Sequence, residues 1–304
     1  MRILTVFTGG TIACSENGGT LSPDSANSAL LLRLYRNKTG DDETEFISVQ
    51  PFSILSENMD FDRLDALADC LLAQSMADYD GVIVAHGTDT LAYTAAYLSL
   101  RFGKCAPPVV LVSANYPLAD SRSNGVDNFC GAMAFLRAKR GEGVFVSYRN
   151  GDSFTTIHRG IEVMPHLPYS DSVFSLFDNV YGRAEGGEFL RDPDYRERGL
   201  PKPEGLPDGR VLWLRAHVGM SFPVDLSGVR AVLLEGYHSG TLPTDGEPLR
   251  DFCALAKREG VPVFLTGACE GFAYESKLMY DELNIRVLPP MSPVAAYVLL
   301  SGIK

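Results

Sequence analysis

The chain has 304 residues, of which 45% are hydrophobic and 21% charged, and its formal net charge is −11 at pH 7. This length is sufficient for two domains, each with its own core. The basic clusters, such as Arg137-Ala-Lys-Arg140, are typical of a solvated helix end. An acidic chain of this kind lacks the contacts that nucleic acids and anionic membranes require, so we expect neither as a partner.

Six cysteines are spread along the chain without any Cys-x-x-Cys pair, which predicts free thiols in a reducing compartment and no metal centre. No apolar run approaches the ~20 residues that a membrane-spanning helix needs. The apolar run at residues 3–7 is also too short for a signal peptide. We therefore expect a cytoplasmic protein.

Apolar strand patterns and helical patterns alternate along the first half of the chain. The sequence predicts strands and helices in the order strand 2–8, helix 25–36, strand 46–50, helix 61–77, strand 80–86, helix 89–101, strand 108–113, helix 122–138 and strand 143–148. This succession is typical of an α/β fold with a doubly wound, largely parallel sheet in the N-terminal domain.

The composition changes between residues 174 and 209, where Gly-Gly, Asp-Pro and Pro-Lys-Pro-Glu-Gly segments are typical of a linker. We therefore expect an N-terminal domain over residues 1–190, a linker over 191–209 and a smaller α/β C-terminal domain over 210–304. The elements predicted for this second domain are strands 210–214, 229–234 and 261–266 and helices 246–258, 275–283 and 292–301.

The segment His86-Gly-Thr-Asp-Thr90 follows the short apolar run Asp80-Gly-Val-Ile-Val-Ala85. Such a run predicts a parallel strand that is covered on both faces, and the residues after the segment predict a helix. Thr88 and Asp89 are thus expected at a strand-to-helix turn, where an α/β sheet binds its ligand. The same residue types are favoured as helix N-caps, so this segment alone allows either interpretation.

A second segment also consists of a strand followed by a turn with glycine and threonine. The strand 2–8 runs into Gly9-Gly10-Thr11, where two glycines permit a tight turn and close approach of the backbone to a ligand. A phosphate-binding loop is a minor alternative, because Gly-x-Gly-x-x-Gly is absent and no Gly-Lys-Ser/Thr follows. Two hydroxyls, of Thr11 and Thr88, and the Asp89 carboxylate at the ends of parallel strands suit acyl transfer.

These two segments carry a family resemblance. Thr8-Gly-Gly-Thr-Ile-Ala13 and His86-Gly-Thr-Asp-Thr-Leu91 resemble the two signature motifs of the bacterial-type L-asparaginase family. That family also includes glutaminase-asparaginases and the amidase-like subunit of an archaeal tRNA amidotransferase. Residues 54–59 resemble the family's substrate loop, residues 112–117 its next strand end, and residues 123–129 the following helix start.

The resemblance implies catalytic roles for three residues. Thr11 would be the nucleophile that attacks the carbon of a side-chain amide, from which ammonia leaves. Thr88 would be the second threonine, which attacks the substrate or activates the water that releases the acid. Asp89 would complete a triad with a basic residue near Thr88, or bind the ammonium group of the substrate.

The resemblance also implies three substrate-binding residues. Ser56 and Glu57 match the positions that hold the α-carboxylate and α-ammonium groups of the substrate. Without the resemblance, the same pair is more typical of an exposed turn or a helix cap before Met59-Asp60. Ala114 matches the position whose backbone contacts the scissile amide.

The chain departs from the family pattern at the position of the catalytic base, which is a lysine in the family. The family lysine lies in a segment resembling Arg-Gly-x-x-x-x-Lys, but residues 159–165 end in Pro165, and no lysine occurs between Lys139 and Lys202. His166 and His158 are the nearby groups with a pKa suited to proton transfer. His166 is therefore the candidate for a fourth catalytic residue, although a lone histidine beside a proline is more often structural.

A second departure concerns the lid after the first motif. Family members place a tyrosine there, whereas residues 15–22 offer only Thr20 and Ser22. In the family, the active site lies where the N-terminal domain of one subunit meets the C-terminal domain of its neighbour. The resemblance thus implies a homodimer or homotetramer, to whose site Tyr237 and His238 of the second domain are candidate contributors.

Taken together, the motifs predict an amidohydrolase without a cofactor or metal, acting on L-asparagine or a related small-molecule amino-acid amide. The alternative is a catalytically impaired amino-acid-binding or regulatory protein that retains the pocket, because the lysine and the lid tyrosine are absent. A nucleotide-binding α/β protein is a third interpretation, disfavoured by the missing phosphate loop and by the acidic residues Glu57 and Asp89.

Overall fold

The computed structural model describes residues 1–10, 12, 14–17, 20–23, 26–151, 153–199, 209–268 and 274–302, and all their side chains except those of 14–17, 20–23 and 26–28. The chain divides into two compact units, Met1–Arg198 and Gly199–Ile303. Within the described ranges, every helix is too short or too polar to cross a membrane.

The first unit contains an eight-stranded sheet in the order β10-β9-β8-β7-β6-β5-β1-β4, helices on both of its faces, and a separate two-stranded hairpin, β2–β3. Its elements are β1 (Arg2–Phe7), β2 (Cys14–Asn17), β3 (Thr20–Pro23), α1 (Ala26–Thr39), β4 (Glu45–Val49), α2 (Phe61–Ala73), β5 (Gly81–Ala85), α3 (Leu91–Phe102), β6 (Val109–Val112), α4 (Gly125–Ala138), β7 (Val144–Arg149), β8 (Thr155–Arg159), β9 (Gly182–Glu185) and β10 (Glu188–Arg191).

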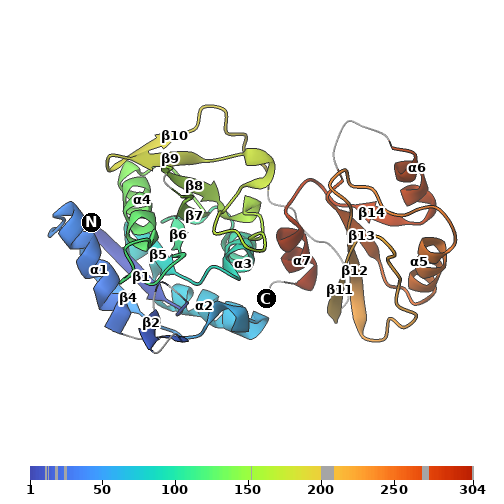
Figure 1. Cartoon of the computed structure of the whole chain (residues 1–304), viewed down its shortest axis with the longest axis horizontal. Coiled ribbons are helices and arrows are strands. Elements are labelled where there is room, and N and C mark those ends of the chain that lie inside the picture. The colour runs from blue at the N-terminus through green and yellow to red at the C-terminus, as the bar shows by residue number, and fades with distance from the viewer. Residues whose placement is uncertain are drawn as a thin grey trace. The chain divides into compact units, whose positions relative to one another are not determined.

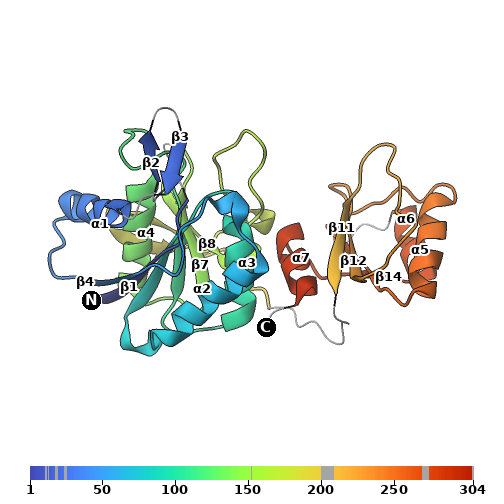
Figure 2. The same ribbon diagram turned by 90° about the horizontal axis from the view of Figure 1, so that it is seen from below.

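The central strands β4, β1, β5, β6 and β7 are parallel. Helices α1 and α4 cover one face of these strands, and α2 and α3 cover the other, as Figures 1 and 2 show. All residues of β5 and β6 are buried, which explains their continuous apolar sequences. The predicted doubly wound α/β sheet is therefore confirmed.

Aromatic side chains fill the core between the sheet and α4. The ring of Phe135 lies 4.6 Å from that of Phe145 on β7, and the ring of Phe129 lies 5.0 Å from that of Tyr35 on α1. All four side chains are at most 1% exposed. Burying a side chain of this size stabilises the fold by about 1.5–3 kcal/mol, so this face anchors α4 firmly to the strands.

The sequence did not predict the antiparallel edge of the sheet. Strands β8, β9 and β10 extend it beyond β7 in antiparallel order. Gly186 and Gly187, which had suggested a linker, form the two-residue turn between β9 and β10, with φ of 58° and 83°. Two successive positive φ values match the right-handed twist of a hairpin, and glycine adopts them without strain.

The chain after β10 still packs against the first unit. The Asn179 side chain donates to the carbonyl oxygen of Arg196 at 2.9 Å and accepts from its N–H at 3.0 Å. Nε of Arg198 lies 3.8 Å from Oε1 of the buried Glu162. Residues 192–198 of the expected linker thus belong to the first unit, whereas residues 200–208 lie outside the described ranges.

The second unit is a smaller α/β body with a four-stranded, all-parallel sheet in the order β11-β12-β13-β14. The sequence predicted its elements except the short strand β14. They are β11 (Arg210–Arg215), β12 (Val229–Glu235), α5 (Pro248–Arg258), β13 (Val263–Thr266), α6 (Glu275–Glu282), β14 (Ile285–Val287) and α7 (Pro293–Ser301).

Glycines allow three segments of the first unit to meet at the end of β1. Gly9 forms a parallel bridge with Ile54, and the N–H of Gly10 donates to the carbonyl oxygen of Ile54 at 2.9 Å. A methyl group added to Gly10 would lie 2.3 Å from Cα of Gly87, and one added to Gly87 would lie 2.4 Å from Oγ of Ser56. No side chain larger than hydrogen fits at either glycine without displacing its neighbour.

We expect Gly10→Ala to destabilise the protein more than Gly40→Ala. Both glycines have a left-handed backbone, with φ of +75° and +69°, so both variants incur about 1–2 kcal/mol of strain. Only Gly10 is also opposed by another backbone; nothing lies within 4 Å of the added methyl at Gly40. Overpacking should add about 1–3 kcal/mol at Gly10, which urea unfolding would measure. Equal losses in the two variants would contradict the close approach.

Candidate active site

The carboxyl ends of β1 and β5 form the point where the strand order of the sheet reverses. From β1 the chain moves to β4 on one side and then returns past β1 to β5 on the other. Ligands of open α/β sheets bind in the crevice outside the strand ends at such a point. Both threonine motifs begin here, because β1 and β5 are parallel neighbours, with Phe7 opposite Ala85.

His86 holds the turn after β5 in place. Its side chain is fully buried; Nδ1 lies 2.8 Å from the carbonyl oxygen of Gly87, and Nε2 lies 2.9 Å from the hydroxyl of Thr94 on α3. A carbonyl can only accept, so the proton is on Nδ1 and the Thr94 hydroxyl donates to Nε2. Burial lowers the pKa of His86 to about 4, which keeps the ring neutral. His86 is therefore a structural residue of the turn.

Thr88 and Asp89 do not cap the helix that follows them. The N-cap residue of α3 is Thr90, whose side chain makes no capping bond; its hydroxyl donates to the carbonyl oxygen of Ser56 at 2.8 Å. The Ser56 hydroxyl in turn donates to the Asp89 carboxylate at 3.2 Å. Thr88 is half-buried and Asp89 is exposed. The geometry thus favours a ligand site at the turn over the N-cap interpretation.

Only part of the first threonine motif, residues 8–13, lies among the described residues. Thr11 lies outside the described residues, and so do the side chains of the hairpin β2–β3 that carries Thr20 and Ser22. Its neighbours Gly9 and Gly10 are described, and Gly10 abuts Gly87, the residue before Thr88. The backbones of the two motifs are therefore in contact at one edge of the sheet.

The remaining substrate-binding candidates lie on the loops around this edge. Glu57 is exposed in the short 3-10 turn Ser56–Asn58, while Ala114 is fully buried just after β6. A reciprocal pair of hydrogen bonds holds the backbone next to Ala114: the N–H of Asn115 donates to Oδ1 of Asn124 at 3.0 Å, and the N–H of Asn124 donates to Oδ1 of Asn115 at 3.1 Å.

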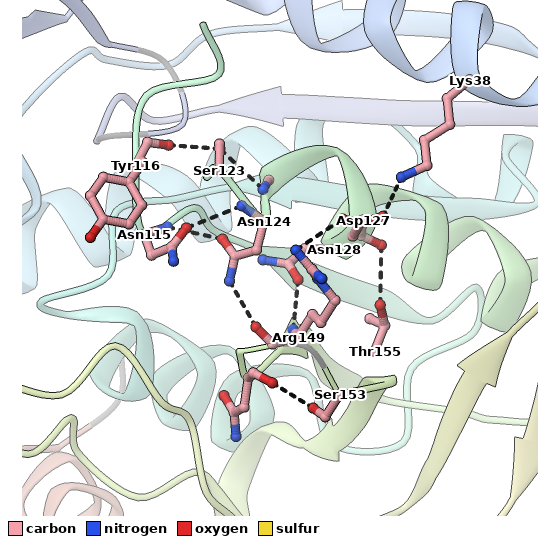
Figure 3. A network of polar contacts seen from close by, with 12 residues as sticks. Lys38, Asn115, Tyr116, Ser123, Asn124, Asp127, Asn128, Arg149, Ser153 and Thr155 are labelled. Atoms are coloured by element: carbon pink, nitrogen blue, oxygen red, sulfur yellow. Dashed lines mark hydrogen bonds and ion pairs between the residues drawn. The ribbon is translucent and has the colours of Figure 1, made fainter. Parts of the chain in front are cut away.

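Figure 3 shows that this pair belongs to a wider polar network between the ends of β6 and β7 and the start of α4. Asn128 on α4 donates to the carbonyl oxygen of Ser113 at 2.8 Å and accepts from the N–H of Arg149 at 2.7 Å. Asn124 also donates to the carbonyl oxygen of Arg149 at 2.9 Å. The asparagines lie in segments 112–117 and 123–129, which resemble the family, but the sequence did not predict the hydrogen bonds that they make.

His166 lies within electrostatic reach of Asp89. Burial lowers the pKa of His166, and the negative charges of Asp89 and Asp171 oppose this shift. Nε2 of His166 is buried and has no hydrogen-bond partner among the described residues. Its ring contacts that of Tyr148 at the end of β7 edge to face, with 6.1 Å between the centroids. A neutral imidazole near Asp89 has the chemistry of a proton acceptor.

The other candidates lie elsewhere. His158 is in the middle of β8, opposite Val146, where Nδ1 lies 2.8 Å from the hydroxyl of Ser175 and burial lowers its pKa to about 4. It is thus a buried residue of the sheet interior and not of its carboxyl edge. Tyr237 and His238 lie in the second unit, after β12.

In the described part of the chain, no three His, Cys, Asp or Glu side chains converge as a metal site.

Comparisons with known proteins agree with the motifs. The family model for the N-terminal domain of asparaginase matches residues 2–170. A glutamyl-tRNA(Gln) amidotransferase subunit from Aeropyrum pernix is 33% identical over an alignment of 288 residues, which covers 87% of this chain and 64% of that relative's length. The L-asparaginase of Thermococcus kodakarensis is 29% identical over an alignment of 285 residues, which covers 89% of this chain and 81% of that one.

Solved structures show the same fold. The structure of the thermostable L-asparaginase from Thermococcus kodakarensis superposes with a TM-score of 0.79 at 24% identity, covering 98% of this chain and 91% of that one. L-asparaginase I from Vibrio cholerae gives a TM-score of 0.74 at 23% identity, covering 98% and 90%. With a family model that matches more than half of its length, the chain belongs to the asparaginase family.

Proposed function

We propose that this protein is an amidohydrolase that hydrolyses the side-chain amide of L-asparagine or a related amino-acid amide to the acid and ammonia. The contact between Gly10 and Gly87 carries the proposal, because it brings the Thr11 and Thr88 motifs to one strand edge beside the bonded pair Ser56–Asp89. Two hydroxyls and a carboxylate at one edge suit acyl transfer through a covalent intermediate.

In the proposed mechanism, Thr11 attacks the amide carbon and ammonia leaves. Thr88 then either attacks the acyl carbon itself or activates the water that releases the acid. Ser56, Glu57 and Asp89 hold the α-carboxylate and α-ammonium groups of the substrate. The backbone beside Ala114 contacts the scissile amide. N–H donors aimed at the developing oxyanion contribute on the order of 3–4 kcal/mol each in comparable sites.

Ammonia release from L-asparagine tests the proposal. We expect turnover by the parent protein. In Thr88→Ala, kcat should fall by at least about 100-fold, since a residue that attacks the substrate or activates the water acts in the transition state. Thr39→Ala is the matched control: Thr39 ends α1, and its hydroxyl donates to the carbonyl oxygen of Tyr35. A Thr88→Ala variant with the parent's kcat would remove Thr88 from the mechanism.

We further propose His166 as the base in place of the family lysine, whose position holds Pro165. The influence of the Asp89 charge on His166 supports this assignment. An unassisted threonine hydroxyl is a poor nucleophile at neutral pH, so a group near it must accept its proton.

If His166 is the base, kcat should rise with pH through the pKa of His166 and then level off, because only neutral imidazole accepts a proton. Burial lowers this pKa, so the rise should lie below the usual histidine value of about 6.5. His166→Ala should lose most of the activity while asparagine binding persists. The steady-state pH profile decides: an unchanged profile and kcat in the alanine variant would exclude His166.

We also propose that the protein is a homodimer or homotetramer in which the C-terminal domain of a neighbour, with Tyr237 and His238, closes the site. The reason is the family resemblance, together with a lid segment that offers only Thr20 and Ser22. Sedimentation velocity should give a dimer or tetramer at working concentration. A monomer that is fully active at that concentration would rule out a shared site.

A second candidate function follows from the relatives named as subunits of a glutamyl-tRNA(Gln) amidotransferase, in which the same amide chemistry would serve a larger enzyme. The net charge of −11 disfavours direct contact with tRNA. The absence of lysine at Pro165 favours a third candidate, an amino-acid-binding protein without efficient turnover. Asparagine binding without ammonia release would support that alternative.

A further inference from the structure

The fully buried Tyr148 packs against the half-buried His166 on one side of the sheet. The Ser147 hydroxyl donates to the carbonyl oxygen of Asn128 on α4, so the next side chain on β7, Tyr148, points to the opposite face. Tyr148 is fully buried, yet neither its hydroxyl nor Nε2 of His166 has a hydrogen-bond partner among the described residues. Buried polar atoms are rarely left unpaired, so two in contacting rings require an explanation.

The Asn124 amide lies near the phenol. Burial raises the pKa of Tyr148 to about 12, and the Asn124 amide opposes this shift. The amide nitrogen donates to the carbonyl oxygen of Arg149 and the amide oxygen accepts from the N–H of Asn115, and among the described residues the Tyr148 hydroxyl has no hydrogen-bond partner. The phenol is therefore neutral, and its hydroxyl is available to His166.

The groups that face His166 set its charge. Among the described residues, the carboxylates of Asp89 and Asp171 favour the imidazolium, burial favours the neutral ring, and the facing ring of Tyr148 carries no charge. The neutral ring has two tautomers, and only the one with its proton on Nε2 leaves Nδ1 free to accept. A base at this place therefore needs a group that accepts the proton on Nε2.

We propose that Tyr148 is a positioning residue for His166. One ordered water accepts a hydrogen bond from Nε2–H of His166 and donates one to the phenol oxygen of Tyr148. The lone pair of the neutral ring is thereby kept on Nδ1. The two atoms do not bond directly in the structure, and a buried water bridges polar atoms well when both lack other partners. In the first step Nδ1 takes the proton of the attacking hydroxyl and gives it to the leaving ammonia. In the second step it takes a proton from the attacking water and gives it to the departing threonine oxygen. This inference rests on the proposed amidohydrolase function.

Tyr148→Phe tests the inference, because it removes only a hydroxyl that lacks a protein partner and should leave the fold intact. The readouts are kcat and KM for asparagine and the NMR titration of the His166 ring, identified among the five histidines by its loss in His166→Ala. Tyr181→Phe is the control: it breaks a real hydrogen bond, 2.7 Å to the carbonyl oxygen of Arg140, away from the strand edge that carries Thr88.

We expect Tyr148→Phe to lower kcat by about 10-fold or more with KM within about 3-fold, the pattern of an interaction made in the transition state. The pKa of His166 should fall by about half a unit, because the imidazolium loses an acceptor for Nε2–H. Tyr181→Phe should change neither quantity.

An unmoved His166 titration in Tyr148→Phe would overturn the inference, whatever happens to kcat. A shifted titration with the parent's kcat would overturn it as well, because the pair would then have no part in turnover. If the parent protein releases no ammonia, the proposed function fails, and Tyr148 loses its catalytic purpose. The His166 titration in Tyr148→Phe would still show whether the two side chains interact. A failure of the inference can therefore be distinguished from a failure of the proposed function.

Discussion

The backbone contact between Gly10 and Gly87 is the constraint on which the candidate site depends. Two turns at the ends of neighbouring parallel strands approach so closely that a methyl group on Gly10 would lie 2.3 Å from Cα of Gly87. Gly87 is also pressed against Ser56, whose hydroxyl bonds Asp89. The glycines of both motifs therefore allow the two turns to approach each other, and their lack of a side chain is a requirement of packing.

The histidines of the first unit show how burial and hydrogen bonding separate structural from chemical roles. His86 has both ring nitrogens bonded, which fixes its tautomer and leaves no site for a further proton. His158 is buried in the middle of the sheet beside Ser175. His166 differs from both, because it lies at the strand edge, under the influence of the Asp89 charge, with Nε2 unpaired among the described residues.

The position of the family lysine illustrates how a fold can persist while its chemistry changes. Pro165 cannot transfer a proton, but the strand edge still contains Thr88, Asp89 and the Asn115–Asn124 pair beside Ala114. These parts depend on backbone hydrogen bonds and close packing, which a substitution at residue 165 does not disturb. In the proposed mechanism, the base is the component that changes, from the family lysine to the neighbouring His166.

The sequence by itself determined the alternation of strands and helices, the parallel sheet and the two threonine motifs, because apolar runs and glycine turns are local signals. It did not reveal strands β8–β10, since their short, polar pattern and the Gly186-Gly187 turn resemble a linker. Only the tertiary structure decided that Ser56 bonds Asp89, 33 residues away, and that Tyr148 meets His166. Such contacts join residues distant in the chain, and their geometry exists only once the strands have found their neighbours.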